Sequence, residues 1–177
     1  ASSLVISKVQ GNIVDTLMPP LSPLELVIGY TVGGMLRGYA VAFAVILVTF
    51  PFLKLGIAHP LWAFLFLSLG SALLSLIGLL AGIVSDRFDQ MNAITNFIIT
   101  PLSFLSGTFY SIDILPATMQ TITHFNPVFY LIDGMRYGVI GVSDRSPVLG
   151  AAVCGGLCLV LAFWGWRWFS TGYRLKS

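Results

Sequence analysis

The chain has 177 residues, of which 56% are hydrophobic and only 9% carry a charge. Soluble domains carry about 25% charged residues, so this composition excludes a protein whose whole surface meets water. Nine Lys and Arg against seven Asp and Glu leave a formal net charge of +2, and no basic run or tail indicates a nucleic-acid partner. The sequence therefore predicts an all-α, polytopic transmembrane helical bundle that forms one domain over residues 1–177.

The first segment, residues 1–25, is too polar to span a membrane. Its apolar residues recur every four positions, at Val5, Val9, Ile13 and Leu17. This period is typical of a short amphipathic helix, which we expect to end at Pro19-Pro20. Such a helix either lies on the lipid surface or docks a cytoplasmic protein, and the pattern alone favours neither. The segment has no initiator Met and no signal peptide, so we expect the chain to be a fragment without its beginning.

Four stretches are long and apolar enough to cross the hydrocarbon core, which takes about 20 residues. They are predicted at residues 26–53, 61–84, 91–112 and 146–166. The first reaches this length only if Arg37 lies a few turns inside the helix, where its guanidinium either snorkels or faces the bundle interior. Small residues four apart, such as Gly34 and Gly38 or Ser71 and Ser75, predict close helix packing.

Residues 113–138 are apolar but contain Pro116 and Pro127, and they allow two topologies. If this segment does not span, six Lys and Arg lie on one side of the membrane and three on the other. The six are Lys8, Arg37, Arg87, Arg167, Arg174 and Lys176. If it spans, the division falls to five against four. Because Lys and Arg accumulate on the cytoplasmic side, we expect four spans, both ends cytoplasmic, and a re-entrant helical hairpin at 113–138 on the outer face.

Catalytic motifs are absent from the sequence. It contains no G-x-x-x-x-G-K-[ST] phosphate loop, no H-E-x-x-H metal pair and no G-x-S-x-G nucleophile elbow. Packing is the expected role of Cys154 and Cys158, which lie four apart in an apolar stretch. Asp133 and Arg136 have the spacing of a helical ion pair. We therefore expect no enzyme activity of the chain by itself, and no catalytic, cofactor or metal site.

One region of the sequence resembles the signature of ABC-2 type transporter permeases. Residues 99–111 read ITPLSFLSGTFYS, Leu115-Pro116 follows, and residues 124–138 read HFNPVFYLIDGMRYG. Upstream, residues 10–13, 19–23 and 37–38 also look like the family's segment between its second and third spans. The resemblance covers essentially the whole chain. Because family members have six spans, it implies that this chain lacks the first two.

The resemblance also implies a function and a set of partners. Two permease subunits, here a homodimer, would form the membrane path of a bacterial inner-membrane exporter. Two separate ATPase subunits would bind ATP and Mg²⁺ and drive export of a drug, a lipid or a glycan-type substrate. In this family the loop before span three is a coupling helix, so the resemblance favours docking for residues 8–18.

The site residues implied by the resemblance fall into two sets. Those expected to contact the ATPase are Lys8, Val9, Gln10, Asn12, Ile13 and Asp15. Those expected in the outer gate and hairpin are Gly107, Tyr110, Pro116, Asn126, Pro127 and Arg136. The residues of the substrate path stay unassigned.

Two other classes of membrane protein remain as alternatives. A secondary transporter would need a coupling-ion site, which is typically built from intramembrane carboxylates, and the four predicted spans contain none. A membrane scaffold without transport activity would have the same glycine pairs. It would have no need of an amphipathic helix ahead of Pro19.

Overall fold

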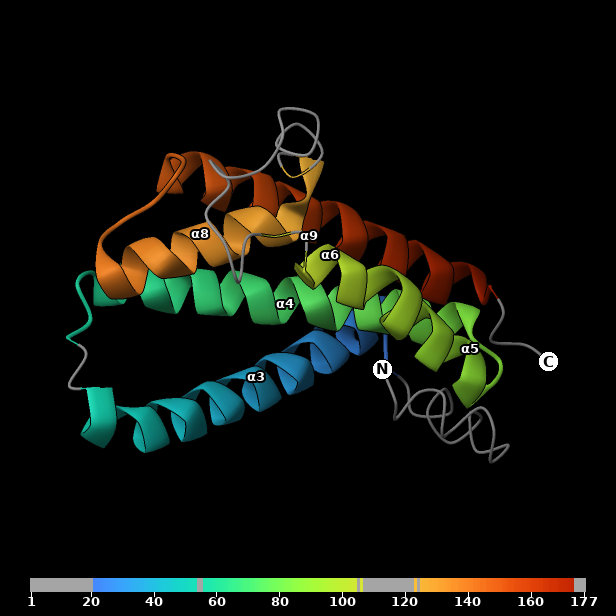
Figure 1. Cartoon of the computed structure of the whole chain (residues 1–177). Helices are drawn as coiled ribbons and strands as arrows, with labels where there is room; N and C mark the ends of the chain where they lie inside the picture. The colour runs from blue at the N-terminus through green and yellow to red at the C-terminus, as the bar shows by residue number, and fades with distance from the viewer. Residues whose placement is uncertain (1–20, 54–55, 105, 107–122, 124, 174–177) are drawn as a thin grey trace.

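The computed structural model describes residues 21–53, 56–104, 106, 123 and 125–173, and every regular element within them is a helix. The elements in chain order are α3 (Pro23–Leu53), α4 (Pro60–Val84), α5 (Phe88–Ile94), the π-helical turn η1 (Thr95–Ile99), α6 (Thr100–Phe104), α8 (Pro127–Ile140) and α9 (Pro147–Thr171) (Figure 1). The all-α class predicted from the sequence is confirmed.

Three helices in the described part of the chain are long and apolar enough to cross a membrane. They are Pro23–Thr49 within α3, Pro60–Val84 and Pro147–Thr171. They overlap the predicted spans at 26–53, 61–84 and 146–166, in agreement with a polytopic protein. For the predicted span at 91–112, α5, η1 and α6 follow one another without a break from Phe88 to Phe104, and residues 107–112 lie outside the described residues.

The ends of the helices follow from local capping chemistry. Helix α3 begins at Pro23 because the Ser22 amide donates to Glu25 Oε2 at 2.6 Å, and the Glu25 amide donates to Ser22 Oγ at 3.3 Å. This reciprocal pair is a capping box, and it places α3 three residues ahead of the predicted start at 26. Helices α8 and α9 are followed by the capping residues Gly141 and Gly172, whose φ angles of 83° and 67° lie in the left-handed region that favours glycine.

The π-helical turn η1 interrupts the run from α5 to α6. The Thr100 amide donates to the Thr95 carbonyl, five residues back, and the Thr100 hydroxyl donates to the same oxygen at 3.1 Å. Pro101 comes next and has no amide hydrogen, so an α-helical bond from residue 101 to the Phe97 carbonyl is impossible. The wide turn therefore lies directly ahead of the residue that breaks the hydrogen-bond ladder.

Helix α4 is the centre of the bundle and contacts α3, α8 and α9. Two buried apolar clusters lie along it. The first consists of Leu26, Val27, Leu76, Leu79, Ile83 and Phe169, and joins α3, α4 and α9. The second consists of Phe66, Leu73, Leu131 and Cys154, and joins α4, α8 and α9. Cys154 therefore has the packing role that the sequence predicted.

Helix α3 runs antiparallel to α4 and approaches it closely through glycines. A Cβ atom at Gly34 would overlap the Ser75 hydroxyl, and one at Gly38 would overlap the Ser71 hydroxyl. The close packing predicted for these pairs is thus present between the two helices. Further along α3, the Tyr39 hydroxyl donates to Ser68 Oγ at 2.9 Å.

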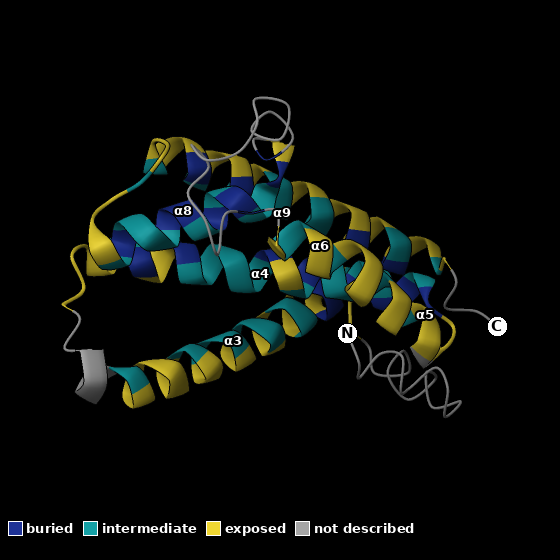
Figure 2. Cartoon of the chain, viewed as in Figure 1, coloured by how far each residue is buried: buried dark blue, intermediate teal, exposed yellow. Residues whose placement is uncertain are grey.

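Beyond this crossing, α3 separates from α4 toward its C-terminal end (Figure 1). Its side chains there are mostly exposed (Figure 2), with Val41 at 60% and Leu47 at 62%. The separation also leaves an apolar cavity of about 570 Å³ between the end of α3, the beginning of α4 and the end of α8.

Helix α8 lies antiparallel along the first half of α4. Its C-terminal end is fixed to the residues before α4 by two backbone hydrogen bonds. The Ala58 amide donates to the Val139 carbonyl at 3.1 Å, and the His59 amide donates to the Gly138 carbonyl at 2.8 Å. With 14 residues against the 25 of α4, helix α8 is about 21 Å long. It therefore begins beside the middle of α4.

Candidate functional site

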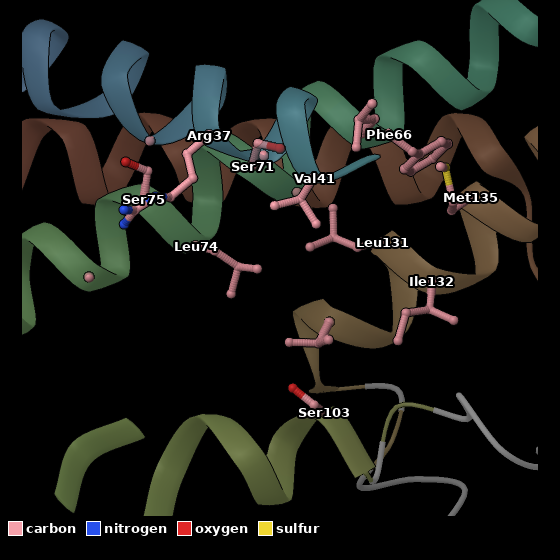
Figure 3. Close-up of a pocket in the computed structure, with 16 residues that line it drawn as sticks. Arg37, Val41, Phe66, Ser71, Leu74, Ser75, Ser103, Leu131, Ile132 and Met135 are labelled. Carbon is pink, nitrogen blue, oxygen red and sulfur yellow. The ribbon is translucent and has the colours of Figure 1, made fainter. Parts of the chain in front are cut away.

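A groove of about 650 Å³ lies between α3, α4, α6 and α8 (Figure 3). This volume is in the range of about 300–1,000 Å³ that small-molecule sites occupy. Helix α4 forms one wall, with Phe66, Ser71 and Leu74 among its lining residues, and α3 contributes Arg37 and Val41. Because the lining residues come from four elements, the bundle has to be assembled before the groove exists.

Three polar residues of the groove lie at one end of it, and Ser103 of α6 lies apart from them. Arg37 and Ser75 lie together there, with Ser71 beside them (Figure 3). The Ser75 hydroxyl donates to the Tyr30 carbonyl at 3.1 Å, and the Ser103 hydroxyl on α6 donates to the Ile99 carbonyl at 2.9 Å. Both hydroxyl protons are used in the protein, so these two serines present acceptor lone pairs rather than free protons to a ligand.

The opposite end of the groove is apolar. Phe66 of α4 and Met135 of α8 lie there, and Leu131 lies between them and Val41 (Figure 3). Phe66 is also buried against Gly134, where a Cβ atom would overlap its ring. The aromatic wall is therefore held in place by the packing of α8 on α4.

A second constellation joins α8 to α9 through the loop at 141–146. Asp133 is buried, with 3% of its surface exposed, and its two carboxylate oxygens accept backbone hydrogens from this loop. Oδ1 accepts from the Asp144 amide at 2.8 Å, and Oδ2 accepts from the Arg145 amide at 3.0 Å. Asp133 therefore anchors the loop by hydrogen bonds to a charged acceptor.

Arg136 completes this cluster. Its Nη1 atom lies 3.0 Å from Asp144 Oδ2 and 4.0 Å from Asp133 Oδ1. The pair that the sequence spacing predicted is present at the longer distance, and the nearer partner is a residue of the loop. Both partners of the shorter ion pair keep 26% of their side-chain surface exposed, so the pair belongs to the rim of the cluster.

Asn126 connects α8 to α6. Its side-chain oxygen accepts the Val128 amide hydrogen at 3.0 Å and thereby caps α8, while its Nδ2 donates to the Leu102 carbonyl at 2.7 Å. With 4% of its surface exposed, Asn126 is a buried capping residue. The N-P dipeptide seen in the sequence is therefore the start of a helix, with Pro127 in the first turn.

The predicted site residues fall into three groups. The proposed ATPase contacts Lys8, Val9, Gln10, Asn12, Ile13 and Asp15 lie outside the described residues. So do Gly107, Tyr110 and Pro116 of the proposed gate. Asn126 and Pro127 lie at the beginning of α8 and Arg136 near its end, separated by about 14 Å along the helix, so these three do not form one cluster.

Two structural features of the candidate site were missed by the sequence reasoning. Arg37 was singled out, but nothing in the sequence placed it in one groove with Ser75 and Ser103, which come from other helices. Asp133 was paired with Arg136, and its hold on the loop was not foreseen. The one available signal was an acid within a mostly apolar helix, followed by the turn at residues 141–146.

The three long apolar helices are those of a multi-pass membrane protein, and the candidate groove lies between helices of this bundle. Residues 1–140 match the family model described as ABC-2 type transporter. The chain belongs to this family, and it is a membrane permease component of an ABC transporter, a class in which a partner ATPase supplies the energy.

Individual relatives agree with this assignment. The inner membrane transport permease YadH of Escherichia coli strain K12 is 34% identical over 179 residues, which cover all of this chain and 69% of the relative. Nodulation protein J of Rhizobium leguminosarum bv. trifolii is 31% identical over 88 residues, which cover 48% of this chain and 31% of that protein. No solved structure matches the chain significantly. The chain is thus a multi-pass inner-membrane protein.

Proposed function

We propose that this chain is the membrane-spanning subunit of an ATP-driven exporter and acts as a homodimer. The observation that carries the proposal is the match of residues 1–140 to the ABC-2 type transporter family. The similarity to an inner membrane transport permease over the whole chain supports the same function. We infer a drug, a lipid or a glycan-type compound as the substrate, because the resemblance to this family implies substrates of these kinds.

Energy for transport has to come from a separate ATPase. The sequence contains no phosphate loop, and ATP with its Mg²⁺ would be held by the partner. Nucleotide then shifts the permease between inward and outward states only by binding the two states of the complex with different free energies. The segment at 8–18 is the proposed contact, since its apolar period and its place before α3 fit a docking helix.

The proposed topology gives α8 a place at the outer face. With α4 across the membrane, α8 begins at about half its depth and ends on the side where α4 begins, before the chain continues into α9. We propose that this side is the outside and that both ends of the chain are cytoplasmic, in line with the division of Lys and Arg, which is still five against three when Arg37 is left out because it lies within α3. Arg136 and Asp144 then lie near the outer surface.

Coupling to the ATPase is tested with a charge in the proposed docking helix. In the full-length permease, Val9→Glu is expected to lower ATPase recovery per permease roughly tenfold, because a charge would have to leave water on docking. Asp15→Ala serves as control and should stay near wild type, since an exposed polar contact contributes under about 1 kcal/mol. Insertion and dimer formation should be unchanged, as measured by size-exclusion chromatography. Wild-type ATPase recovery and transport for Val9→Glu would remove the docking assignment.

Orientation is tested by labelling single cysteines in a Cys154→Ala, Cys158→Ala background. Ala58 precedes α4 and Asp89 lies in α5, and both residues are exposed. We expect an impermeant maleimide to label Ala58→Cys in intact cells, whereas Asp89→Cys should be labelled only after the membrane is opened. Labelling of Asp89→Cys from outside would reverse the proposed topology without affecting the family assignment.

A further inference from the structure

Arg37 is a cation within a part of the bundle that is built to cross a membrane. It lies near the middle of the 31-residue α3, and its neighbour across the groove, Ser71, lies near the middle of the 25-residue α4. Both helices are long and apolar enough to span. An ionisable side chain at such a position is costly and is typical of a functional site with a partner.

No acidic side chain in the described part of the chain offers Arg37 that partner. The carboxylates there are Glu25, Asp86, Asp89, Asp133 and Asp144, and none of them lines the groove. Within the described residues, Arg37 makes no ion pair and no side-chain hydrogen bond. The nearby Ser75 donates its proton to Tyr30 and so presents only oxygen lone pairs to the guanidinium.

The shape of the groove restricts which kind of anion suits Arg37. From the polar end at Arg37, the lining passes Val41 and Leu131 to the apolar end at Phe66 and Met135 (Figure 3). A small soluble anion would occupy only the first part and would leave the rest to be filled by something apolar. A molecule with an acidic head and a hydrocarbon tail matches both ends at once.

The groove opens between exposed apolar side chains. Val41 and Leu74 border it and are 60% and 46% exposed. Where these residues face the hydrocarbon layer, a molecule dissolved in that layer reaches the opening without crossing water. We propose that the groove binds an anionic phospholipid drawn from the bilayer, with its phosphate on Arg37 and one acyl chain along Leu131 toward Met135.

The chemistry of arginine suits this ligand. The guanidinium presents a planar fork of donors that pairs with two phosphate oxygens and stays charged at all accessible pH values. The acyl chain replaces lipid contacts with contacts to Leu131 and Phe66, so little apolar surface is lost when the molecule enters. The proposal concerns binding, and it stands whether or not the lipid is transported and whether or not the ATPase coupling proposed above is correct.

Binding is measured on the full-length permease in nanodiscs of phosphatidylcholine with a minor fraction of phosphatidylglycerol. Native mass spectrometry gives the ratio of the two lipids that stay on the protein. We expect wild type to enrich phosphatidylglycerol about tenfold over its bulk fraction. Arg37→Gln should abolish this enrichment, and Arg37→Lys should keep part of it because the charge remains.

A second variant blocks the groove without touching the charge. Leu74→Trp adds bulk at an exposed lining position, so it should reduce retention of phosphatidylglycerol several-fold while leaving the melting temperature unchanged. Leu159→Trp is its matched control, because Leu159 is 74% exposed on α9 and does not line the groove. Arg167→Gln is the control for charge, since Arg167 is exposed and also lies outside the groove.

Several results would overturn the proposal. Equal enrichment in wild type and Arg37→Gln would show that Arg37 binds no headgroup. An equal loss in Arg167→Gln would mean that net charge alone attracts the lipid. Displacement of phosphatidylglycerol by millimolar inorganic phosphate would identify a soluble anion as the occupant. Full retention in Leu74→Trp would place the lipid outside the groove.

Discussion

Replacing Gly138 with alanine is expected to destabilise the permease by about 3 kcal/mol, the upper end of the usual cost of overpacking. A Cβ atom there would lie 2.5 Å from the Ala63 amide nitrogen and 2.6 Å from the Ala63 Cα. These are backbone atoms of α4, so no side-chain rotation relieves the overlap. Helix α8 would have to move away from α4, and the hydrogen bond from the His59 amide to the Gly138 carbonyl would weaken.

The measurement is thermal unfolding of the purified full-length permease in detergent. Gly156→Ala in α9 is the matched control, because a Cβ atom at Gly156 meets nothing within 4 Å. The same substitution there should stabilise the protein by up to about 1 kcal/mol through helix propensity. The two variants should therefore shift the melting temperature in opposite directions. Equal melting temperatures of the Gly138→Ala and Gly156→Ala variants would show that α8 does not pack on α4 at this distance.

Replacing Asp133 with alanine is expected to cost about 3 kcal/mol as well, because two backbone donors lose a charged acceptor in a buried place. Asp133→Asn keeps the shape and one acceptor oxygen, so about half of this loss is expected. The local readout is hydrogen exchange at the amides of Asp144 and Arg145. Both should exchange faster in Asp133→Ala, and only one of them in Asp133→Asn.

Asp144→Asn is the control for this cluster. It removes the ion pair with Arg136, whose partners are both partly exposed, and should cost under about 1 kcal/mol. Exchange at the Arg145 amide should stay near the wild-type rate, because Asp133 still accepts from it. If Asp144→Asn accelerated exchange as much as Asp133→Ala, the loop would depend on the ion pair rather than on the buried carboxylate.

The fold class and the three long helices could be predicted because bilayer thickness makes hydrophobic length a direct measure of a span. The glycine and serine spacings at residues 34, 38, 71 and 75 also indicated a close approach, since small residues four apart share one helix face. The start of α3 was placed three residues late. The capping box at Ser22 and Glu25 contains the signal that would have corrected it.

The site was less accessible to sequence reasoning for a physical reason. Arg37, Ser75, Ser103 and Met135 come from four elements, and their meeting depends on how the helices cross, which no local pattern encodes. The contacts of Asp133 could not be predicted either, because its partners are backbone amides, which every residue except proline has. Asn126 was picked by resemblance to a motif, and its contact with the Leu102 carbonyl explains why an amide is needed there.

The crossing of α3 and α4 has a mechanical consequence. The two helices approach each other closely at Gly34 and Gly38, near the middle of the 31-residue α3. A rigid rod that turns about such a point moves its two ends in opposite directions. Any displacement imposed beside Pro23 would thus reach the opposite end, where the cavity of about 570 Å³ would widen or close. Helix α3 would in this way transmit motion from one end of the bundle to the other through a crossing at two glycines.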